Sequence, residues 1–306
     1  MHITLRQLKV FSSVARNLSF TRAADELFLT QPAVSMQVKQ LESQLDIALF
    51  EQLGKKIFLT DAGHEVYHYA RLVDEKLAEM ESIINGIKGL HHGKLSISVA
   101  TTANYFAPPL LSTFYKRFPG LNVVLDITNR KTILKQLQDN EVDLVIMGQP
   151  PKEMDLEASA IMENELVVIA PADHPLAKQK QIPMKMLEGE KFLVRESGSG
   201  TRYAMERYFQ SHELNITMGM EVSSDEAIKQ SVQAGLGLGF LSSDAIQTEL
   251  LLNRLVVLDM EHPSRKRYWH IVHRKGKRLS AFAHAFKNFI LEEGPQILGK
   301  EPAGLV

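Results

Sequence analysis

The sequence predicts an α/β protein in three consecutive parts. Short amphipathic helices fill residues 1–60 and predict a helix-turn-helix domain with a small β-hairpin, or wing. An unbroken heptad pattern within residues 61–91 predicts one long linker helix. Strand and helix patterns then alternate over residues 92–306, which predicts an α/β domain built of two lobes.

Length and composition agree with several folded domains. The chain has 306 residues, more than one hydrophobic core usually holds. Hydrophobic residues make up 44% and charged residues 23%, values typical of globular proteins. No apolar run is long enough for a transmembrane helix, and the start MHITLRQLKVF lacks the pattern of an export signal. We therefore expect a cytoplasmic protein that makes no membrane contact.

Cysteine content and net charge limit which kinds of site and partner are possible. The chain contains no cysteine, which excludes disulfides, thiolate metal sites and cysteine nucleophiles. Its net charge is −1, so the molecule as a whole has no electrostatic attraction for nucleic acid. Any DNA binding must come from the local placement of charged and polar side chains.

The first sixty residues predict two helices joined by a tight turn, after an initial helix. Apolar residues at three- and four-residue steps indicate the initial helix: Leu5, Leu8, Phe11, Val14 and Ala15. Ser19 is placed to cap a helix over residues 20–27. Thr30 is placed to cap the next helix, with Pro32 in its first turn. Residues 47–60, with Gly54 near the middle, fit a small β-hairpin.

The outward face of this last helix is the candidate DNA-reading surface. The inward positions are Val34, Val38, Leu41 and Leu45, which leaves Gln31, Pro32, Ser35, Met36 and Lys39 facing outward. Gln31 and Ser35 can bond base edges, and Met36 can touch a thymine methyl group. Lys39 is placed to meet a phosphate, and Lys55 and Lys56 in the hairpin to contact the backbone or the minor groove.

Residues 62–90 predict a helix about 43 Å long with one apolar seam. The seam is formed by Val66, Ala70, Val73, Leu77, Met80, Ile84 and Ile87, at alternating steps of four and three. Such a seam is not stable in water without a partner helix, and the simplest partner is the same helix of a second copy. We therefore expect a homodimer, and the seam by itself leaves a homotetramer open.

The remaining pattern predicts parallel sheets in two lobes, the first about 94–165 plus 270–292 and the second about 166–269. Strands are expected at 95–100, 123–127, 144–147, 166–170, 192–195, 218–222, 237–241, 255–258 and 268–272. Helices are expected near 105–118, 131–139, 201–211, 225–234 and 242–251.

Two strand-to-helix turns predict a site for a small anion between the lobes. Thr101 and Thr102 follow the first strand, and Ser199, Gly200, Thr201 and Arg202 open a helix after the strand at 192–195. Backbone N–H groups at a helix N-terminus attract anions, and Arg202 can add a charge. The alternative is that both turns are simple helix caps.

Three other motifs have simpler explanations. Residues 64–68 read HEVYH, the spacing of a zinc site, but Val66 belongs to the seam and no domain surrounds the helix, so we expect no metal and no cofactor. Residues 235–239 read GLGLG, but they precede a strand, so close backbone packing explains them better than dinucleotide binding. Residues 265–278 carry seven Lys or Arg and no acid. That stretch fits either a solvated strand edge or an auxiliary anion surface.

These motifs resemble one family closely. SFTRAADEL at 19–27, TQPAVSMQVKQLE at 30–42, LF at 49–50 and LTDAG at 59–63 resemble the LysR-type transcriptional regulators. The match is nearly continuous over residues 2–63, and the expected architecture follows to about residue 292. The resemblance implies a winged helix-turn-helix, a dimerising linker helix and a two-lobed effector domain similar to periplasmic solute-binding proteins. It also implies promoter DNA, a small effector and RNA polymerase as partners, and no enzymatic activity.

Within the family, TQPAVSMQVKQLE, LFEQLGKKIFLT, DLVIMGQPP and RESGSGTR together resemble the CbbR branch, which regulates Calvin-cycle and RuBisCO operons. That branch is associated with phosphorylated or nucleotide metabolites, which suits the anion turns. Gln52 and Met36 depart from the family, where arginine is frequent. A phosphate contact at Gln52 and the base readout at Met36 are therefore in doubt.

Other functions remain open at this point. A LysR-type regulator of another metabolic operon would sense a different small carboxylate or an inorganic anion. A solute-binding protein would share the two lobes, but it would not begin with some ninety helical residues. An α/β enzyme would need a converging acid, base or nucleophile, and the sequence indicates no such set.

Overall fold

The structure is a computed structural model, and it describes residues 3–54, 56–87, 93–263, 267–301 and 303. It divides into two compact units, Met1–Ile84 and Asn85–Val306, each considered by itself below. Within the described residues, no helix is both long enough and apolar enough to cross a membrane.

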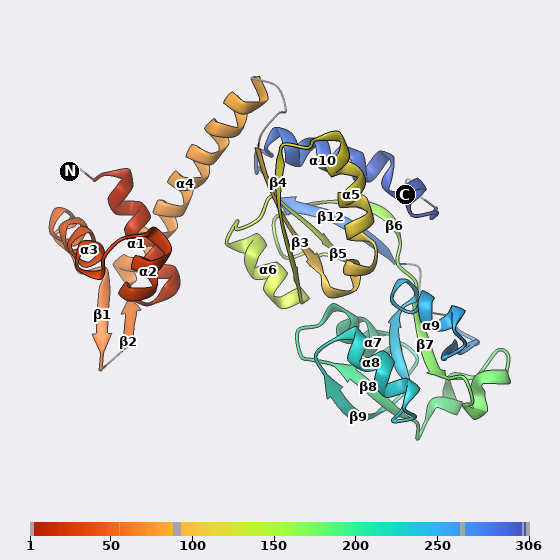
Figure 1. Ribbon diagram of the computed structural model, residues 1–306. Helices are drawn as coiled ribbons and strands as arrows, with labels where there is room; N and C mark the ends of the chain where they lie inside the picture. The colour runs from red at the N-terminus through yellow and green to blue at the C-terminus, as the bar shows by residue number, and fades with distance from the viewer. Residues whose placement is uncertain (1–2, 55, 88–92, 264–266, 302, 304–306) are drawn as a thin grey trace. The chain divides into compact units, whose positions relative to one another are not determined.

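The first unit is a winged helix-turn-helix followed by a long helix (Figure 1). Its elements are α1 (Leu5–Asn17), α2 (Phe20–Leu27), α3 (Gln31–Leu45), β1 (Phe50–Leu53), β2 (Lys56–Leu59) and α4 (Asp61–Ile87). The small side chains of Ala23 and Ala24 let α2 approach its neighbours, and both are buried with Val34 and Val38 of α3. Gly54, in the turn of the hairpin, has a φ of +65°, which favours glycine.

Local capping explains where the first helices begin. Ser19 accepts a hydrogen bond from the backbone N–H of Arg22 at 3.3 Å, so the cap predicted for α2 is confirmed. Thr30 occupies the N-cap position of α3, but its side chain makes no capping hydrogen bond. Pro32 in the first turn of α3 has no N–H to satisfy, which reduces the need for a cap there.

The first half of α4 belongs to the core of the first unit. Ala70 is 1% exposed, and it packs with Phe11, Leu41 and Leu49, with Val66 at the edge of the same cluster. Val66, which is predicted to pair two chains, is half-buried beside this cluster, and its pairing role stays a prediction. Beyond that cluster, Val73 and Leu77 are half-buried, Met80 is 51% exposed, and the side chains of Ile84 and Ile87 lie outside the described part of α4.

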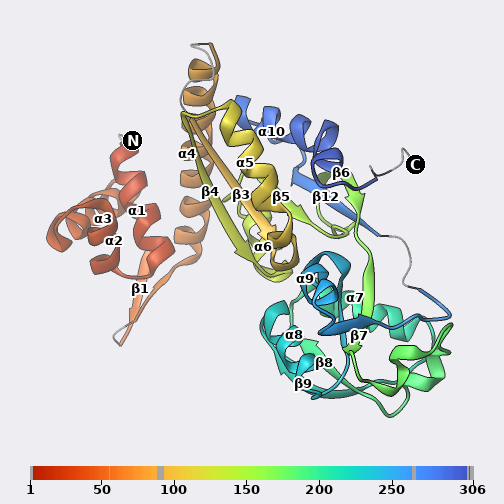
Figure 2. The same ribbon diagram turned by 45° about the vertical axis from the view of Figure 1, so that its right-hand side comes forward.

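The second unit contains two lobes, and the second lobe is inserted into the first (Figure 2). The first lobe is built from β3 (Gly93–Ala100), the 3₁₀ helix η1 (Thr101–Tyr105), α5 (Ala107–Arg117), β4 (Leu121–Thr128), α6 (Arg130–Gln138), β5 (Leu144–Met147), β6 (Leu156–Glu163), β12 (Tyr268–Arg274), α10 (Ala281–Glu292) and α11 (Gly294–Ile297). Its sheet has the strand order β4-β3-β5-β12-β6. Leu95 and Ile97 of β3 face a core shared with α5 and α10, whereas Val145 of β5 faces α6 on the other side.

The second lobe holds two small sheets, β10-β7-β11 and β8-β9. Its elements are β7 (Leu166–Pro171), η2 (Pro175–Lys178), η3 (Met184–Leu187), β8 (Lys191–Arg195), α7 (Gly200–Gln210), β9 (Thr217–Val222), α8 (Asp225–Gln233), β10 (Gly239–Ser242), η4 (Ser243–Ala245), α9 (Gln247–Leu251) and β11 (Leu255–Val257). All nine predicted strands are present. The helix predicted over 242–251 is instead the short pair η4 and α9.

Two expectations about the sheets are corrected. Only the small sheet β8-β9 is parallel throughout. The sheet of the first lobe is mixed, because β12 runs antiparallel to β5 and β6, and the sheet β10-β7-β11 is antiparallel throughout. The chain returns from the second lobe at β12, so this strand enters the sheet of the first lobe from the opposite end. The strand β6 was not predicted, because its first residues are largely exposed and the segment LEASAIME lacks a clear apolar alternation.

Two of the three glycines at 235–239, Gly237 and Gly239, serve close packing, as predicted. A Cβ on Gly237, whose φ is +153°, would lie 2.4 Å from the backbone oxygen of Lys191. The neighbouring backbone joins the two sheets of this lobe, since the N–H of Leu238 donates to that same oxygen at 2.8 Å. Gly235 also has a positive φ, of +75°, but nothing lies within 4 Å of its Cβ position.

This difference yields a stability prediction. Gly237→Ala is expected to lower the free energy of unfolding by about 2–3 kcal/mol, because steric overlap adds to backbone strain. Gly235→Ala, the matched control, is expected to cost only about 1 kcal/mol, from the backbone alone. Denaturant unfolding measures both, and equal losses would mean that close packing at Gly237 has no energetic weight.

Candidate functional site

The outer face of α3 is a polar surface without an acidic side chain. Gln31, Pro32, Met36 and Lys39 are exposed and Ser35 is half-buried, and together they line one shallow groove with Gln40, Ser43 and Gln44. Glu42 is the only acid of α3, and it accepts hydrogen bonds from the backbone N–H groups of Leu49 and Phe50 at 2.8 and 3.2 Å. The carboxylate of α3 therefore holds the start of the wing by these two hydrogen bonds.

The wing has one exposed lysine among its described residues. Lys56 is exposed at the start of β2, and Lys55 lies outside the described residues. The side-chain amide of Gln52 donates to the backbone oxygen of Gly54 at 2.9 Å, so it stabilises the turn of the hairpin. That bond gives Gln52 a structural role inside the wing.

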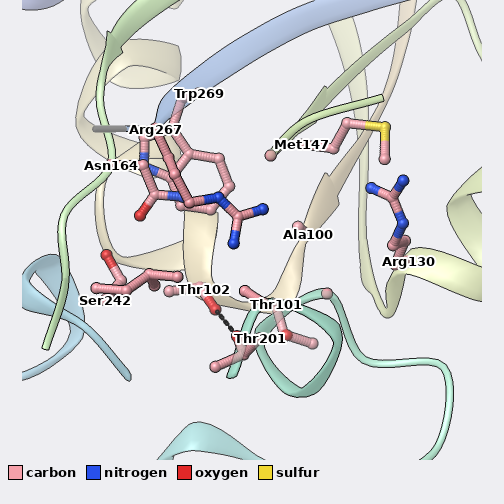
Figure 3. Close-up of a pocket in the computed structure, with 14 residues that line it drawn as sticks. Ala100, Thr101, Thr102, Arg130, Met147, Asn164, Thr201, Ser242, Arg267 and Trp269 are labelled. Carbon is pink, nitrogen blue, oxygen red and sulfur yellow. Dashed lines mark hydrogen bonds between the residues drawn. The ribbon is translucent and has the colours of Figure 1, made fainter. Parts of the chain in front are cut away.

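A cleft in the second unit brings together residues from both lobes (Figure 3). It encloses about 520 Å³ of empty space, its open mouth included. The lining residues are Ala100, Thr101, Thr102, Arg130, Met147, Gly148, Asn164, Leu166, Gly200, Thr201, Ala204, Ser242, Arg267 and Trp269. Four of the six residues predicted for the effector line this cleft, namely Thr101, Thr102, Gly200 and Thr201.

Ser199 and Arg202 lie outside the lining, each for a clear reason. The hydroxyl of Ser199 caps α7 by accepting from the N–H groups of Thr201 and Arg202 at 3.2 and 3.5 Å. The guanidinium of Arg202 pairs with Glu206 at 2.8 Å and with Glu221 at 2.5 Å. These two hydrogen bonds raise the pKa of Arg202 and hold its charge away from the cleft. The assignment of Arg202 to the effector is therefore corrected, and the N–H groups capped by Ser199 are not free for a ligand.

Two arginines that the sequence did not single out as ligands face the cleft instead. Arg130 begins α6, and Arg267 precedes β12; Figure 3 shows Arg267 reaching into the cleft and Arg130 on the opposite wall. Burial lowers the pKa of both groups, and the charges of Arg130 and Arg207 lower the pKa of Arg267 further. Among the described residues, neither guanidinium has a carboxylate within ion-pair distance.

Only Arg267 had a signal in the sequence, because it lies in the basic stretch 265–278. The structure favours the second explanation of that stretch at this residue, since Arg267 lines the cleft rather than a solvated edge. Arg130 follows the helix cap Asn129 and has no neighbouring motif. Its guanidinium donates to the backbone oxygen of Gln149 at 2.6 Å and lies over the ring of Tyr203, 5.6 Å from its centroid. These contacts depend on the tertiary fold.

The threonines of the cleft are held from behind by a buried ion pair. Arg195 is 1% exposed and Asp225 is 4% exposed, and they form a short ion pair. Arg195 also donates to the hydroxyl oxygen of Thr101 from both terminal nitrogens, each at 3.3 Å. The hydroxyl of Thr102 donates to Asp225 at 3.0 Å and lies 3.4 Å from the hydroxyl oxygen of Thr201. Both lobes thus contribute to one hydrogen-bonded network.

The chemistry available in the cleft is binding rather than catalysis. The polar groups are cations, hydroxyls and the amide of Asn164, set against the apolar walls of Trp269, Met147 and Leu166. Within the described part of the chain, no group of three His, Asp or Glu side chains is placed to hold a metal ion. The arrangement suits a small anion with an apolar portion.

Comparison with known proteins agrees with this geometry. The bacterial regulatory helix-turn-helix protein, lysR family, matches residues 5–64, and the LysR substrate binding domain matches residues 88–295. The chain belongs to the LysR family. It is therefore a DNA-binding transcriptional regulator, and not an enzyme.

Individual relatives show which branch of the LysR family this chain resembles. A RuBisCO operon transcriptional regulator of Allochromatium vinosum is 50% identical over 297 residues, covering 97% of this chain and 98% of the relative. The regulator CbbR of Rhodospirillum rubrum is 42% identical over 286 residues, covering 94% of this chain and 95% of the relative. The predicted resemblance to the CbbR branch is thus confirmed.

A solved structure resembles the second unit. It is the regulatory domain of CcmR from Synechocystis PCC6803 in complex with 2-PG. It is 40% identical, with a TM-score of 0.64, and the match covers 65% of this chain and 96% of that domain.

Proposed function

We propose that this LysR-family regulator controls carbon-fixation genes, such as a RuBisCO operon, in response to a small phosphorylated metabolite. The target is supported by the RuBisCO operon regulator that is 50% identical over nearly the full length of both chains. The ligand class is supported by the complex of the related CcmR domain with 2-phosphoglycolate. As a regulator of DNA, the protein is expected to work in the cytoplasm, with RNA polymerase as a further partner.

The observation that carries the ligand proposal is the pair Arg130 and Arg267. Two half-buried guanidiniums, neither paired with a carboxylate among the described residues, repel each other, and a bound anion would relieve that cost. A metabolite with a phosphate and a second anionic group would give each guanidinium a bidentate partner. The hydroxyls of Thr101, Ser242 and the amide of Asn164 would bond the remaining oxygens.

The DNA contacts are assigned to α3 and the wing. The groove on α3 has no acid, and its N-terminal residues Gln31 and Ser35 are placed to bond base edges, as in other recognition helices. Pro32 and Met36 offer apolar contacts beside them, and Lys39 is assigned to phosphate. Lys56 is assigned to the DNA backbone, with Lys55 expected beside it.

The dimer contact is assigned to the part of the α4 seam that the first unit does not cover. Val73, Leu77 and Met80 follow the buried Ala70 along the helix, and Met80 leaves half of its apolar surface in water. Ile84 and Ile87 continue the same seam in the sequence. Pairing of two such helices would place two recognition helices on a pseudo-palindromic site.

The first prediction concerns the anion. Arg267→Gln is expected to weaken binding of 2-phosphoglycolate by about a hundredfold, because it removes a charged bidentate donor from a partly buried site. Arg202→Gln is the matched control and should bind within about threefold of wild type. The reason is that the guanidinium of Arg202 already pairs with Glu206 and Glu221. Calorimetry on the ligand measures both, and wild-type affinity in Arg267→Gln would place the effector elsewhere.

The second prediction concerns base readout. Gln31→Ala and Ser35→Ala should each cost about 1–3 kcal/mol of specific binding and relax the preference at one operator position. Lys56→Gln should weaken operator and non-operator DNA alike and lower the salt dependence of binding. Footprinting and salt titrations with the full chain separate the two patterns. An unchanged footprint and affinity in the Gln31→Ala and Ser35→Ala double variant would remove α3 from the major groove.

The third prediction concerns assembly. Met80→Lys is expected to abolish the dimer, because it places a charge in an apolar seam. Since Met80 is exposed in the single chain, the substitution leaves the core of the first unit intact. His68→Lys adds the same charge on an exposed position of α4 turned away from the seam, and it should not change the mass in solution. Light scattering that shows Met80→Lys assembling like wild type would contradict the seam.

A further inference from the structure

A line of hydroxyl groups leads from the cleft to a buried carboxylate. Thr102 of η1 and Thr201 of α7 both line the cleft, and their hydroxyl oxygens are 3.4 Å apart. The hydroxyl of Thr102 donates onward to Asp225 at 3.0 Å. Asp225 is 4% exposed and lies behind the lining rather than in it.

The number of protons on each group decides which group donates in each hydrogen bond of this line. A threonine hydroxyl has one proton and two lone pairs, and an ionised carboxylate can only accept. Because Thr102 gives its proton to Asp225, Thr201 is left as the donor in the contact between the two threonines. Both hydroxyls therefore donate their protons to protein acceptors, Thr102 to Asp225 and Thr201 to Thr102.

Thr101, in the same wall of the cleft, accepts hydrogen bonds from the protein. Arg195 donates to its oxygen from two nitrogens, so the proton of Thr101 remains free for a ligand. An anion in the cleft needs donors, yet only one of these three threonines presents its proton. The other two would have to reverse their bonds before they could bind an anion.

Asp225 is well placed to keep the hydrogen bond that Thr102 donates to it. Its carboxylate is paired with the buried guanidinium of Arg195, and it is the first residue of α8, where the helix dipole favours a negative charge. We propose that Asp225 is an internal anion that competes with the anionic effector for the hydroxyl protons of Thr102 and Thr201. This inference rests on the proposed binding of an anion in the cleft.

The competition couples the ligand to the contact between the lobes. Thr102 belongs to the first lobe, whereas Thr201 and Asp225 belong to the second. When an anion takes the proton of Thr102, the bond between Thr102 and Asp225 across the lobes is given up. The effector thereby gains a different set of contacts in the bound state, which is the requirement for shifting a conformational equilibrium.

Asp225→Asn tests the sign of the effect. The amide of asparagine can donate to Thr102, which frees the proton of Thr102 for the cleft. The full-length variant is expected to bind 2-phosphoglycolate about tenfold more tightly than wild type, although the loss of the ion pair with Arg195 lowers its thermal stability. A purely structural role of Asp225 would leave the affinity unchanged or reduce it. Asp225→Ser, which is neutral and suits a helix N-terminus, gives the same test if the asparagine variant does not fold.

A matched control and a double variant isolate the mechanism. Glu249→Gln makes the same change in another buried acid of the second lobe, paired with Lys229 at 2.9 Å and outside the cleft lining, and it should leave the affinity at the wild-type value. Removal of a nearby negative charge would by itself favour an anion. In a Thr102→Val background, that general effect persists, whereas competition for the proton disappears. We expect most of the tenfold gain to be lost there.

Calorimetry with 2-phosphoglycolate and with inorganic phosphate, repeated for each variant, separates the possible outcomes. Tighter binding in Asp225→Asn that depends on Thr102 supports the competition. Equal or weaker binding, or a gain that persists in Thr102→Val, overturns it while leaving the anion site in place. If wild type binds neither anion, the proposed anion site fails, and the competition fails with it.

Discussion

The buried guanidinium of Arg195 is the constraint on which the second unit depends. Burial alone would lower the pKa of this group, but the charges and hydrogen bonds of Asp225 and Glu196 together raise it. Removing a charge from water is so costly that both carboxylates must stay in place. The end of β8, the start of α8 and the turn after β3 are therefore tied to one point, because Arg195 also donates to Thr101. That point joins the two lobes and supports one wall of the cleft.

The cleft combines opposite charges in two layers. Arg130 and Arg267 face the space where an anion would bind, and the carboxylate of Asp225 lies behind the threonine wall. The cations in front would attract an anion, and the carboxylate behind accepts the hydrogen bond of Thr102. A protein with a net charge of −1 can thus hold a strongly cationic site, because the local arrangement of charge decides binding.

The long helix α4 illustrates how one apolar pattern can serve two purposes. Its heptad seam runs without interruption, but Ala70 is buried by α1, α3 and the loop before β1, with Val66 at the edge of the same cluster. Burial of the first turns fixes α4 to the helix-turn-helix domain. The later seam positions Val73, Leu77 and Met80 remain partly exposed within this unit. A seam that begins in the core of the first unit would transmit the position of a partner helix directly to the recognition helix.

Local patterns in the sequence determined the elements of this protein. Ser19 at a helix N-terminus, Gly54 in a tight turn and the spacing of Val34 and Val38 each act within a few residues, so their consequences could be predicted without the fold. The strand-to-helix turns of Thr101 and Thr201 could be predicted in the same way, but β3 and β8 lie in different sheets, so the contact between the lobes brings the two threonines together.

Only the tertiary structure decided which side chains complete the site and which way the last strand runs. Arg130 and Arg267 lie far apart in the chain and meet because β12 returns antiparallel into the first lobe. Arg202 lies in the first turn of α7, as predicted, but its guanidinium pairs with Glu221 of β9 and does not line the cleft. The direction of a long charged side chain depends on partners from other elements, and no local pattern encodes them.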